Sequence, residues 1–282
     1  MSVLMPEPKG TQLGHATKYA ETYSPSLLFP ISRNLGRDAI GAHDFRGTDL
    51  WRLYEFTWLS PSGLPVAAEV ELSVPATTPN IIESKSLKLY AMSFAMSTFS
   101  SADEVRTVLE RDLSAAAGGK VSVTLNVAGA WQASVHPAPG KLLEVMAPDT
   151  PCAEWEVNPQ PLVPAGASSE TVTWSTNLFR SLCPVTGQPD FASVSVTLKG
   201  AMPSPSALLT YLVSYRRHKG FHEQCVEQIF NDLATRIHPD VLEVRAAFTR
   251  RGGIDINPFR SSVRDTLFCR DTAKTFPRDN RQ

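Results

Sequence analysis

The sequence predicts an α+β fold that contains two copies of one unit, each an antiparallel sheet with helices on one face. The first observation is that apolar and polar residues alternate over residues 50–59 and 66–74 on either side of a turn, as in paired antiparallel strands. The second is that similar strands flank a turn near residue 183, and in both halves a helical pattern follows. At 282 residues with 42% hydrophobic side chains, the chain can bury the core that such a fold requires.

The first half supplies the following elements in order. Residues 1–35 are rich in Pro, Gly, Ser and Thr, which predicts an extended N-terminal segment. After the strand pair, one helix begins near Ser84 and a second begins at Ser101, whose spacing to Glu104 predicts a capping box. Gly118 and the glycine after it end the second helix, and a strand over residues 121–125 follows.

A proline-dense stretch over residues 147–170 predicts a linker, because proline disrupts both helices and central strands. The sequence therefore predicts a first module over residues 36–146 and a second module over residues 171–282.

The second half repeats the pattern of the first. Residues 59–61, Leu-Ser-Pro, align with residues 182–184, Leu-Cys-Pro, and the strand over residues 121–125 aligns with residues 244–248. Each half therefore contains strand, strand, helix, helix and strand, with one further strand expected.

The two copies differ in their polar residues, which indicates one composite site between the halves. The differing positions are Ser60 against Cys183, Glu83-Ser84-Lys85 against Ser204-Pro205-Ser206, and Ala102-Asp103 against His222-Glu223.

Composition excludes several classes of function. The net charge is −1 and the basic residues are spread along the chain, so we expect no direct binding to nucleic acid. No apolar run reaches the roughly 20 residues that span a bilayer, and no signal peptide is visible, so we expect a cytoplasmic protein without membrane contact. The four cysteines (Cys152, Cys183, Cys225 and Cys269) form no Cys-x-x-Cys pair, so we expect neither a metal site nor a disulfide framework.

Cys183 is the first candidate for chemistry. It lies in a turn between two strands, and Asp190 begins the returning strand, so the carboxyl group could exchange protons with whatever the thiol attacks. A buried cysteine beside an aspartate that caps the turn explains the same pattern equally well.

Three further segments carry candidate polar groups. His222 and Glu223 open an amphipathic helix, where the helix dipole stabilises an anion. Glu83 precedes another helix start, and Arg250-Arg251-Gly252-Gly253 combines positive charge with backbone that can approach an anion closely. Charged helix ends and a plain turn remain the alternatives. No Gly-x-Gly-x-x-Gly follows a strand, so a Rossmann domain is not expected.

Four motifs in this order resemble the NADPH-dependent 7-cyano-7-deazaguanine reductases, the nitrile reductases of queuosine biosynthesis, in their long bimodular form. The motifs are Glu83-Ser-Lys-Ser-Leu-Lys-Leu-Tyr90, Leu182-Cys-Pro-Val-Thr-Gly-Gln-Pro-Asp190, Phe221-His-Glu223 and Arg251-Gly-Gly-Ile-Asp-Ile-Asn-Pro258. The resemblance covers nearly the whole chain.

The resemblance implies a role for each matching residue. Cys183 would add to the nitrile carbon and form a covalent thioimidate, Asp190 would donate protons, and His222 would handle a second proton or orient the reacting groups. The residues implied to bind the base are Ile82, Glu83, Ser84, His222 and Glu223. Those implied to bind NADPH are Ser84, Lys85, Arg251 and Gly252, and no metal is implied. For the carboxylates, we expect burial to raise the pKa toward the range that suits proton transfer.

The resemblance also implies the fold and the assembly. It predicts two tandem tunnelling-fold (T-fold) modules and a homodimer that acts on a small deazapurine. Two other functions remain open, namely a cyclohydrolase-like enzyme that handles pterins or purines, and a purine-binding protein without catalytic activity.

Overall fold

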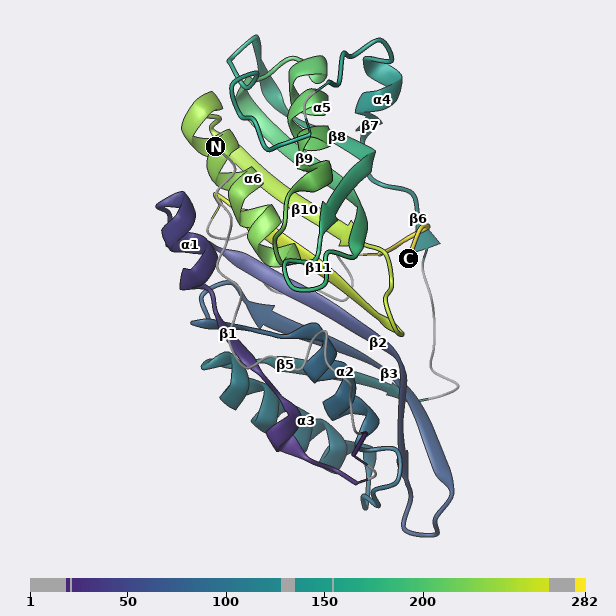
Figure 1. The fold of residues 1–282 in the computed structure, drawn as a ribbon. Coiled ribbons are helices and arrows are strands. Elements are labelled where there is room, and N and C mark those ends of the chain that lie inside the picture. The colour runs from purple at the N-terminus through teal and green to yellow at the C-terminus, as the bar shows by residue number, and fades with distance from the viewer. Residues whose placement is uncertain (1–18, 21, 128–134, 154, 264–276) are drawn as a thin grey trace.

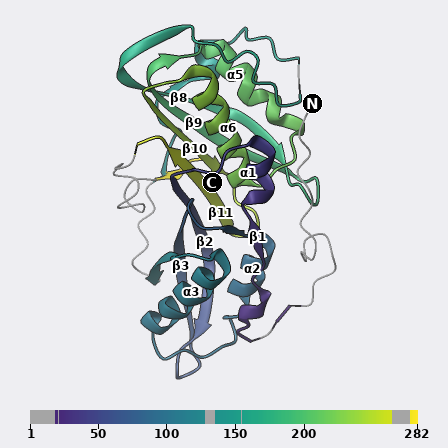
Figure 2. The same cartoon turned by 90° about the vertical axis from the view of Figure 1, so that its left-hand side faces the viewer.

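The computed structural model describes residues 19–20, 22–127, 135–153, 155–263 and 277–282. One eight-stranded sheet runs through the molecule in the order β5-β3-β2-β11-β10-β9-β8-β7, and every neighbouring pair is antiparallel except β7 with β8. Helices α2 and α3 lie beside the strands of the first half, and α5 and α6 lie beside those of the second (Figures 1 and 2). The mixed α+β class with an antiparallel sheet is therefore confirmed.

The main elements follow the expected order in both halves. The first half forms β2 (Gly47–Leu59), β3 (Pro65–Pro75), α2 (Ser84–Met92), α3 (Ala102–Ala117) and β5 (Ser122–Val127). The second half forms β8 (Gly166–Leu182), β9 (Pro189–Met202), α5 (Pro205–Val213), α6 (His222–Ile237), β10 (Val241–Phe248) and β11 (Ile254–Ser261). The shorter elements are η1 (Pro25–Leu27), β1 (Pro30–Ser32), α1 (Asn34–Ile40), β4 (Asn80–Ile82), β6 (Val135–His136), β7 (Lys141–Leu142), α4 (Leu143–Met146), η2 (Ser214–Arg217) and β12 (Arg278–Asp279).

Matching hydrogen bonds join the two helices of each half. Tyr90 on α2 donates to Asp112 on α3 at 2.8 Å, and Tyr211 on α5 donates to Asp232 on α6 at 2.6 Å. These residues are separated by nearly the same interval along the chain, so the internal repeat extends to buried polar contacts as well as to the order of the elements.

A bulge in β2 keeps its aromatic side chains on the core side. Strict alternation would place Phe56 and Trp58 on the face opposite Trp51 and Leu53. The register of β2 against β3 shifts between Leu53 and Phe56, and all four side chains are buried in one core with residues of α2 and α3. One extra residue in the strand changes the face, as β-bulges do.

The predicted start of α3 is confirmed, but its cap has a different partner. The hydroxyl of Ser101 accepts from the amide of Glu104 at 3.2 Å, as expected. The Glu104 carboxylate accepts from the amide of Ser100 at 2.7 Å, which places the return bond one residue earlier than in a standard capping box.

Some expectations fall partly or wholly outside the described residues. Residues 1–18 of the expected N-terminal segment and Cys269 lie outside them. The described part of that segment includes β1, which pairs with β4. Strand β8 begins at Gly166, inside the stretch expected as a linker, because residues 166–168 pair with the end of β9. The domain boundaries themselves stay a prediction.

Pairing of β2 with β11 joins the two halves into one sheet. The register runs from Ile254 opposite Leu53 to Arg260 opposite Gly47. There are two large core clusters, and the cluster of the first half also takes in Ile254 and Ile256 of β11, so this seam is where residues distant in the sequence come into contact. The composite site lies on this seam.

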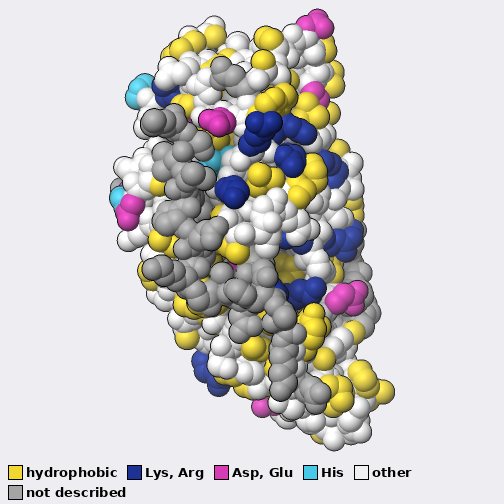
Figure 3. Space-filling view, viewed as in Figure 1, with side chains coloured by type: hydrophobic (Ala, Val, Ile, Leu, Met, Phe, Trp, Pro, Cys, Tyr) yellow, Lys and Arg dark blue, Asp and Glu magenta, His cyan; other side chains and the backbone are white. Residues whose placement is uncertain are grey.

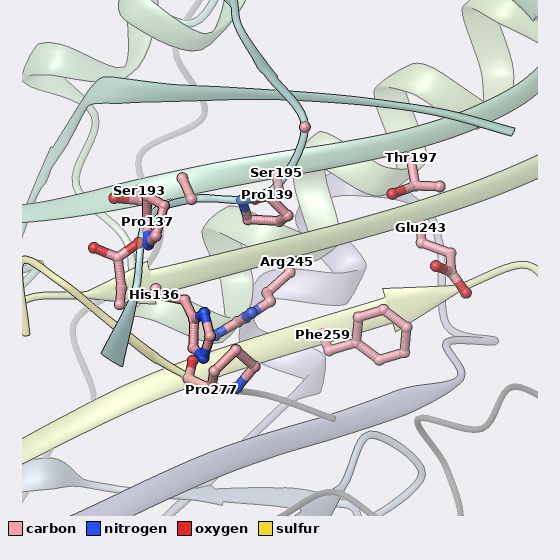
Figure 4. Close-up of a pocket in the computed structure, with 14 residues that line it drawn as sticks. His136, Pro137, Pro139, Ser193, Ser195, Thr197, Glu243, Arg245, Phe259 and Pro277 are labelled. Atoms are coloured by element: carbon pink, nitrogen blue, oxygen red, sulfur yellow. The ribbon is translucent and has the colours of Figure 1, made fainter. Parts of the chain in front are cut away.

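The polar face of the sheet carries a cavity of about 500 Å³. Ser193, Ser195 and Thr197 project into it from β9, with Glu243 and Arg245 from β10 (Figure 4). Arg245 donates to the carbonyl of Pro277 at 2.9 Å, which connects the C-terminal residues to this face. None of the residues expected at the functional site lines this cavity.

Among the described residues, no helix has the length and hydropathy that a bilayer-spanning segment requires.

Replacing Gly47 by alanine tests the seam. Gly47 has a φ of 132°, and an added Cβ would lie 2.0 Å from the carbonyl oxygen of Phe259, so β2 and β11 would have to separate. We expect Gly47→Ala to lower the free energy of unfolding by on the order of 3 kcal/mol, measured by urea denaturation.

Gly63→Ala is the matched control. Gly63 also has a positive φ, 84°, but nothing lies within 4 Å of the added Cβ, so only backbone strain of about 1 kcal/mol is expected. Equal effects of the two substitutions would contradict the close approach at the seam.

Candidate functional site

A small cavity at the seam collects side chains from both halves. Its volume is about 30 Å³, and it is walled by the apolar side chains of Trp51, Ile82 and Ile256 among others. Its polar lining comes from segments that the sequence had indicated as candidates. Those residues are Ser84, Cys183, Asp190, His222, Glu223 and Arg251.

Cys183 is held in the turn between β8 and β9. Its amide donates to the carbonyl of Gln188 at 2.8 Å, and its own carbonyl accepts from the amide of Gly187 at 3.0 Å. The Cys183 side chain is buried, with only 6% of its surface exposed. Because the turn is closed by backbone bonds on both sides, the thiol has a fixed position in the cavity wall.

Asp190 is paired with two basic side chains. Arg251 donates to its Oδ1 atom, and the Nε2 atom of His222 lies 3.4 Å from its Oδ2 atom. Burial alone would raise the pKa of Asp190, but His222 and Arg251 together hold it below its usual value. The sequence-based expectation that burial would raise this pKa is therefore wrong, because the contacts with His222 and Arg251 outweigh desolvation.

The ring of His222 is held by Phe248, which stacks on it with ring centroids 3.8 Å apart and planes at 14°. This contact directs Nε2 toward Asp190. The other ring nitrogen, Nδ1, is buried and has no hydrogen-bond partner in the described part of the chain. His222 can therefore exchange a proton with Asp190 while its second nitrogen remains available.

Glu223 lies one residue further along α6 and is 3% exposed. Burial raises the pKa of Glu223 to about 8, and the negative charge of Asp49 contributes in the same direction. Arg33 and Arg260 oppose the rise. Glu223 is thus the acid of this cavity that is neutral at pH 7, whereas Asp190 is ionised.

A buried ion network lies behind Glu223. Its members, Arg33, Arg37, Asp49, Glu227 and Arg260, come from both halves of the chain and are each less than 10% exposed. Asp49 contacts Arg33 at 2.6 Å and Arg260 at 2.7 Å. Glu227 contacts Arg37 at 2.7 Å and Arg260 at 2.8 Å. Burial would raise the pKa of both acids, yet their arginine partners hold it below the usual value, so both are ionised.

Glu83 has a structural role as the N-cap of α2. Its carboxylate oxygens accept from the amides of Lys85 and Ser86, each at 2.8 Å, and the side chain is 1% exposed. Ser204 caps α5 at the equivalent position of the second half. Glu83 lines neither this cavity nor the next, although its neighbours Ile82 and Ser84 line the cavity wall.

A larger cavity of about 500 Å³ adjoins the small one and shares Ser84, His222, Arg251 and Ile256 with it. Its lining includes the basic residues Lys85, Lys88, Arg250 and Arg251, and no acidic residue among the described ones. Gly252 also lines it, with a φ of 61°, and the side chain of Lys88 lies against its backbone. Figure 3 shows Lys and Arg side chains scattered over the upper and middle part of one face, with a few Asp and Glu side chains among them. The basic lining of the larger cavity fits an elongated ligand with several phosphates.

Comparison with known proteins shows which family this chain belongs to. A family model described as nitrile reductase, 7-cyano-7-deazaguanine-reductase N-term, matches residues 19–125, and one described as QueF-like protein matches residues 189–266. A relative from Azoarcus sp. (strain BH72) is 47% identical over 91% of this chain and 92% of its own. Another from Dechloromonas aromatica (strain RCB) is 46% identical over 89% of each chain. Both are named NADPH-dependent 7-cyano-7-deazaguanine reductase. The chain belongs to the 7-cyano-7-deazaguanine reductase family.

The structure brings together most of the residues that the family resemblance pointed to. Lys85 and Gly252 line the larger cavity, and Glu83 lies beneath the cavity wall as a helix cap. In the part of the chain that the structure describes, no three His, Cys, Asp or Glu side chains are placed to hold a metal ion. Cys152 is half-buried, and Cys225 is buried with its pKa raised by desolvation to about 12.

Sequence reasoning missed the walls and the support of this family's site. Trp51 and Ile256 look like ordinary core residues of strands, and only the β2–β11 pairing places both at the cavity. The ion network was also missed. Arg33 lies in the segment expected to be extended, and Arg37 lies at the start of the first module, where the sequence gave no signal of burial.

The raised pKa of Glu223 predicts a pH-dependent stability. A carboxyl group whose pKa rises on folding destabilises the native state increasingly as pH rises from its unfolded value toward about 8. We expect Glu223→Gln to stabilise the substrate-free protein at pH 8 by about 1 kcal/mol or more, and to have little effect at pH 5. Thermal unfolding at the two pH values measures this.

Asp103→Asn is the control, since Asp103 occupies the equivalent position on α3 and its side chain is 91% exposed. A stabilisation by Glu223→Gln that is the same at pH 5 and pH 8 would rule out the raised pKa.

Proposed function

We propose that this chain reduces the nitrile of 7-cyano-7-deazaguanine to the primary amine of 7-aminomethyl-7-deazaguanine with NADPH, a step of queuosine biosynthesis. The observation that carries the proposal is the shared cavity of Cys183, Asp190, His222 and Glu223, which adjoins a basic cavity. Relatives of this chain bear the corresponding name. The overall change adds four electrons and four hydrogens to the nitrile group.

The first step is addition of the Cys183 sulfur to the nitrile carbon. The Asp190 carboxylate, ionised because of Arg251 and His222, accepts the thiol proton. As the C–S bond forms, the nitrile nitrogen gains negative charge, and Asp190 or His222 returns a proton to it. The product of this step is a covalent thioimidate. The lowered pKa keeps Asp190 in its carboxylate form, so it can accept the thiol proton first and return a proton afterwards.

The adjoining basic cavity fits NADPH, which would supply the hydrides for two successive two-electron reductions when bound there. After the first reduction the C–S bond breaks and the thiolate of Cys183 is restored. Lys85 and Arg251 supply positive charge for phosphates, and Ser84 and Gly252 line the same cavity. His222 borders both cavities and is therefore placed to hold protons at the reacting nitrogen.

Base recognition falls to the buried acids. A carboxylate that accepts two N–H groups selects a guanine-like edge. Glu223 lines the cavity directly, with Ile82, Ser84 and His222 around it. Glu83 supports the same wall, and its carboxylate has lone pairs beyond those used by its two amide donors.

We further propose that each half is a tunnelling-fold module and that the protein is a cytoplasmic homodimer. Support comes from the repeated order of strands and helices and from the sheet edges. Within the described ranges, the 17-residue β8 pairs along its outer side with only the two-residue β7. Such unpaired edges are commonly covered by another chain.

Cys183→Ala tests the covalent mechanism. We expect it to abolish both the mass increase on incubation with 7-cyano-7-deazaguanine and the oxidation of two NADPH per nitrile, because no other described residue can supply the sulfur at this position. Intact-mass spectrometry and absorbance of NADPH measure the two effects.

Cys152→Ala serves as the control, as Cys152 lines a separate cavity. Nitrile reduction that persists in Cys183→Ala at the rate of the parent would eliminate the thioimidate route.

The homodimer is tested by light scattering after gel filtration. We expect twice the 30.8 kDa mass of the chain at micromolar concentration. A monomer mass across that concentration range would contradict the assembly.

A further inference from the structure

The ion network behind Glu223 has a charge imbalance. It contains the three guanidinium groups of Arg33, Arg37 and Arg260 but only two ionised acids, Asp49 and Glu227. Glu223 lies four residues before Glu227 on α6, so the two side chains occupy the same face of the helix. If Glu223 is ionised, three positive and three negative charges balance.

Arg33 has an unused donor in this network. Its Nη2 atom donates to Asp49 at 2.6 Å, and its Nε atom donates to Thr78 at 3.3 Å. Its Nη1 atom is buried and makes no hydrogen bond to any residue that the structure describes, and it lies 3.7 Å from the Oε1 atom of Glu227. A buried guanidinium nitrogen without a partner is costly, so its retention calls for an explanation.

The surroundings of Glu223 restrict which group can use that donor. Asp49 faces it from β2, Arg33 from the segment before α1, and Arg260 from β11. The charged or titratable neighbours on its own helix are His222, Cys225 and Glu227, and Cys183 and Asp190 face it across the cavity. Arg260 is bonded to Asp49 and Glu227, and Arg251, which also lines the cavity, is bonded to Asp190 and Gln188. Among these cations, Arg33 has the buried nitrogen that makes no hydrogen bond to a described residue.

We propose that Arg33 is a positioning residue for base binding, and that its Nη1 group donates to Glu223 when a purine-like base with two N–H donors converts this acid to its carboxylate. The proton of the Glu223 carboxyl group is released to solvent in the same event. This proposal rests on the proposed function, since it assigns the base to Glu223. According to the proposal, Arg33 affects the pH dependence of base binding although it does not touch the base.

The experiment measures binding of 7-cyano-7-deazaguanine by calorimetry in the Cys183→Ala background, where the thiol contributes no proton. Titrations at pH 7 in two buffers of different ionisation enthalpy give the number of protons released. We expect close to one proton per base, falling to zero when Glu223→Gln is added. The affinity should rise about tenfold per pH unit below pH 8 and level off above it.

Substitution of Arg33 separates positioning from mere structural support. In Arg33→Met we expect about tenfold weaker binding at pH 7, because Glu223 has lost its counter-charge. The pH above which the affinity becomes constant should rise by about one unit for the same reason. Arg33→Lys keeps the charge and should restore part of the shift. In the otherwise unaltered enzyme, Arg33→Met should raise the KM for the base and leave kcat nearly unchanged at saturation.

Arg37→Met is the matched control, because Arg37 is buried in the same network but bonds Glu227 rather than Glu223. We expect it to leave the midpoint of the pH dependence in place. An unchanged midpoint in Arg33→Met, or the same displacement in Arg37→Met, overturns the proposal. If Arg33→Met does not fold, the Cys183→Ala protein with Arg33 intact still tests the proposal. Binding of the base to that protein without proton release overturns it.

Failure of the proposed function is distinguishable from failure of this inference. If neither 7-cyano-7-deazaguanine nor 7-aminomethyl-7-deazaguanine binds the background with Arg33 intact, the assignment of the base is wrong. If both bind without proton release, the base assignment stands and the role of Arg33 is rejected.

Discussion

The buried ion network that joins the halves is the interaction on which the rest of this structure depends. Arg260 on β11 bonds both Asp49 on β2 and Glu227 on α6, so one guanidinium connects the seam of the sheet to the helix that carries His222 and Glu223. Charges buried to this extent are stable only when nearly every lone pair and proton has a partner. The network therefore tolerates few alternative arrangements, and it fixes where α6 begins relative to the two central strands.

The site has two acids whose environments push their protonation in opposite directions. Asp190 is buried beside Arg251 and His222, which favour its charge. Glu223 lies deeper, where burial and Asp49 favour its neutral form. In the proposed mechanism, this difference lets Asp190 act first as a base for the thiol. Glu223 stays neutral until a ligand with N–H donors binds.

The internal repeat supplies a common frame, and the site is made from the departures from it. The Tyr–Asp bonds between the helices and the turns after the first strands are present in both halves. The turn that carries Cys183 has a counterpart whose Ser60 amide and Gly63 amide make the same kind of backbone bonds. Because the frames match, a change of side chain in one copy creates a chemical group without altering the fold around it.

The sequence by itself determined the class of fold, the order of its elements, the repeat and the segments that would meet. Those features follow from local periodicity and capping, which the chain encodes over a few residues. It did not determine that a bulge redirects Phe56 and Trp58, that Glu83 caps α2, or that cations lower the pKa of Asp190. It gave no sign that Arg33 and Arg37 are buried. These outcomes depend on partners such as Glu227, 190 residues from Arg37, and only the packed structure sets which charges share a low-dielectric interior.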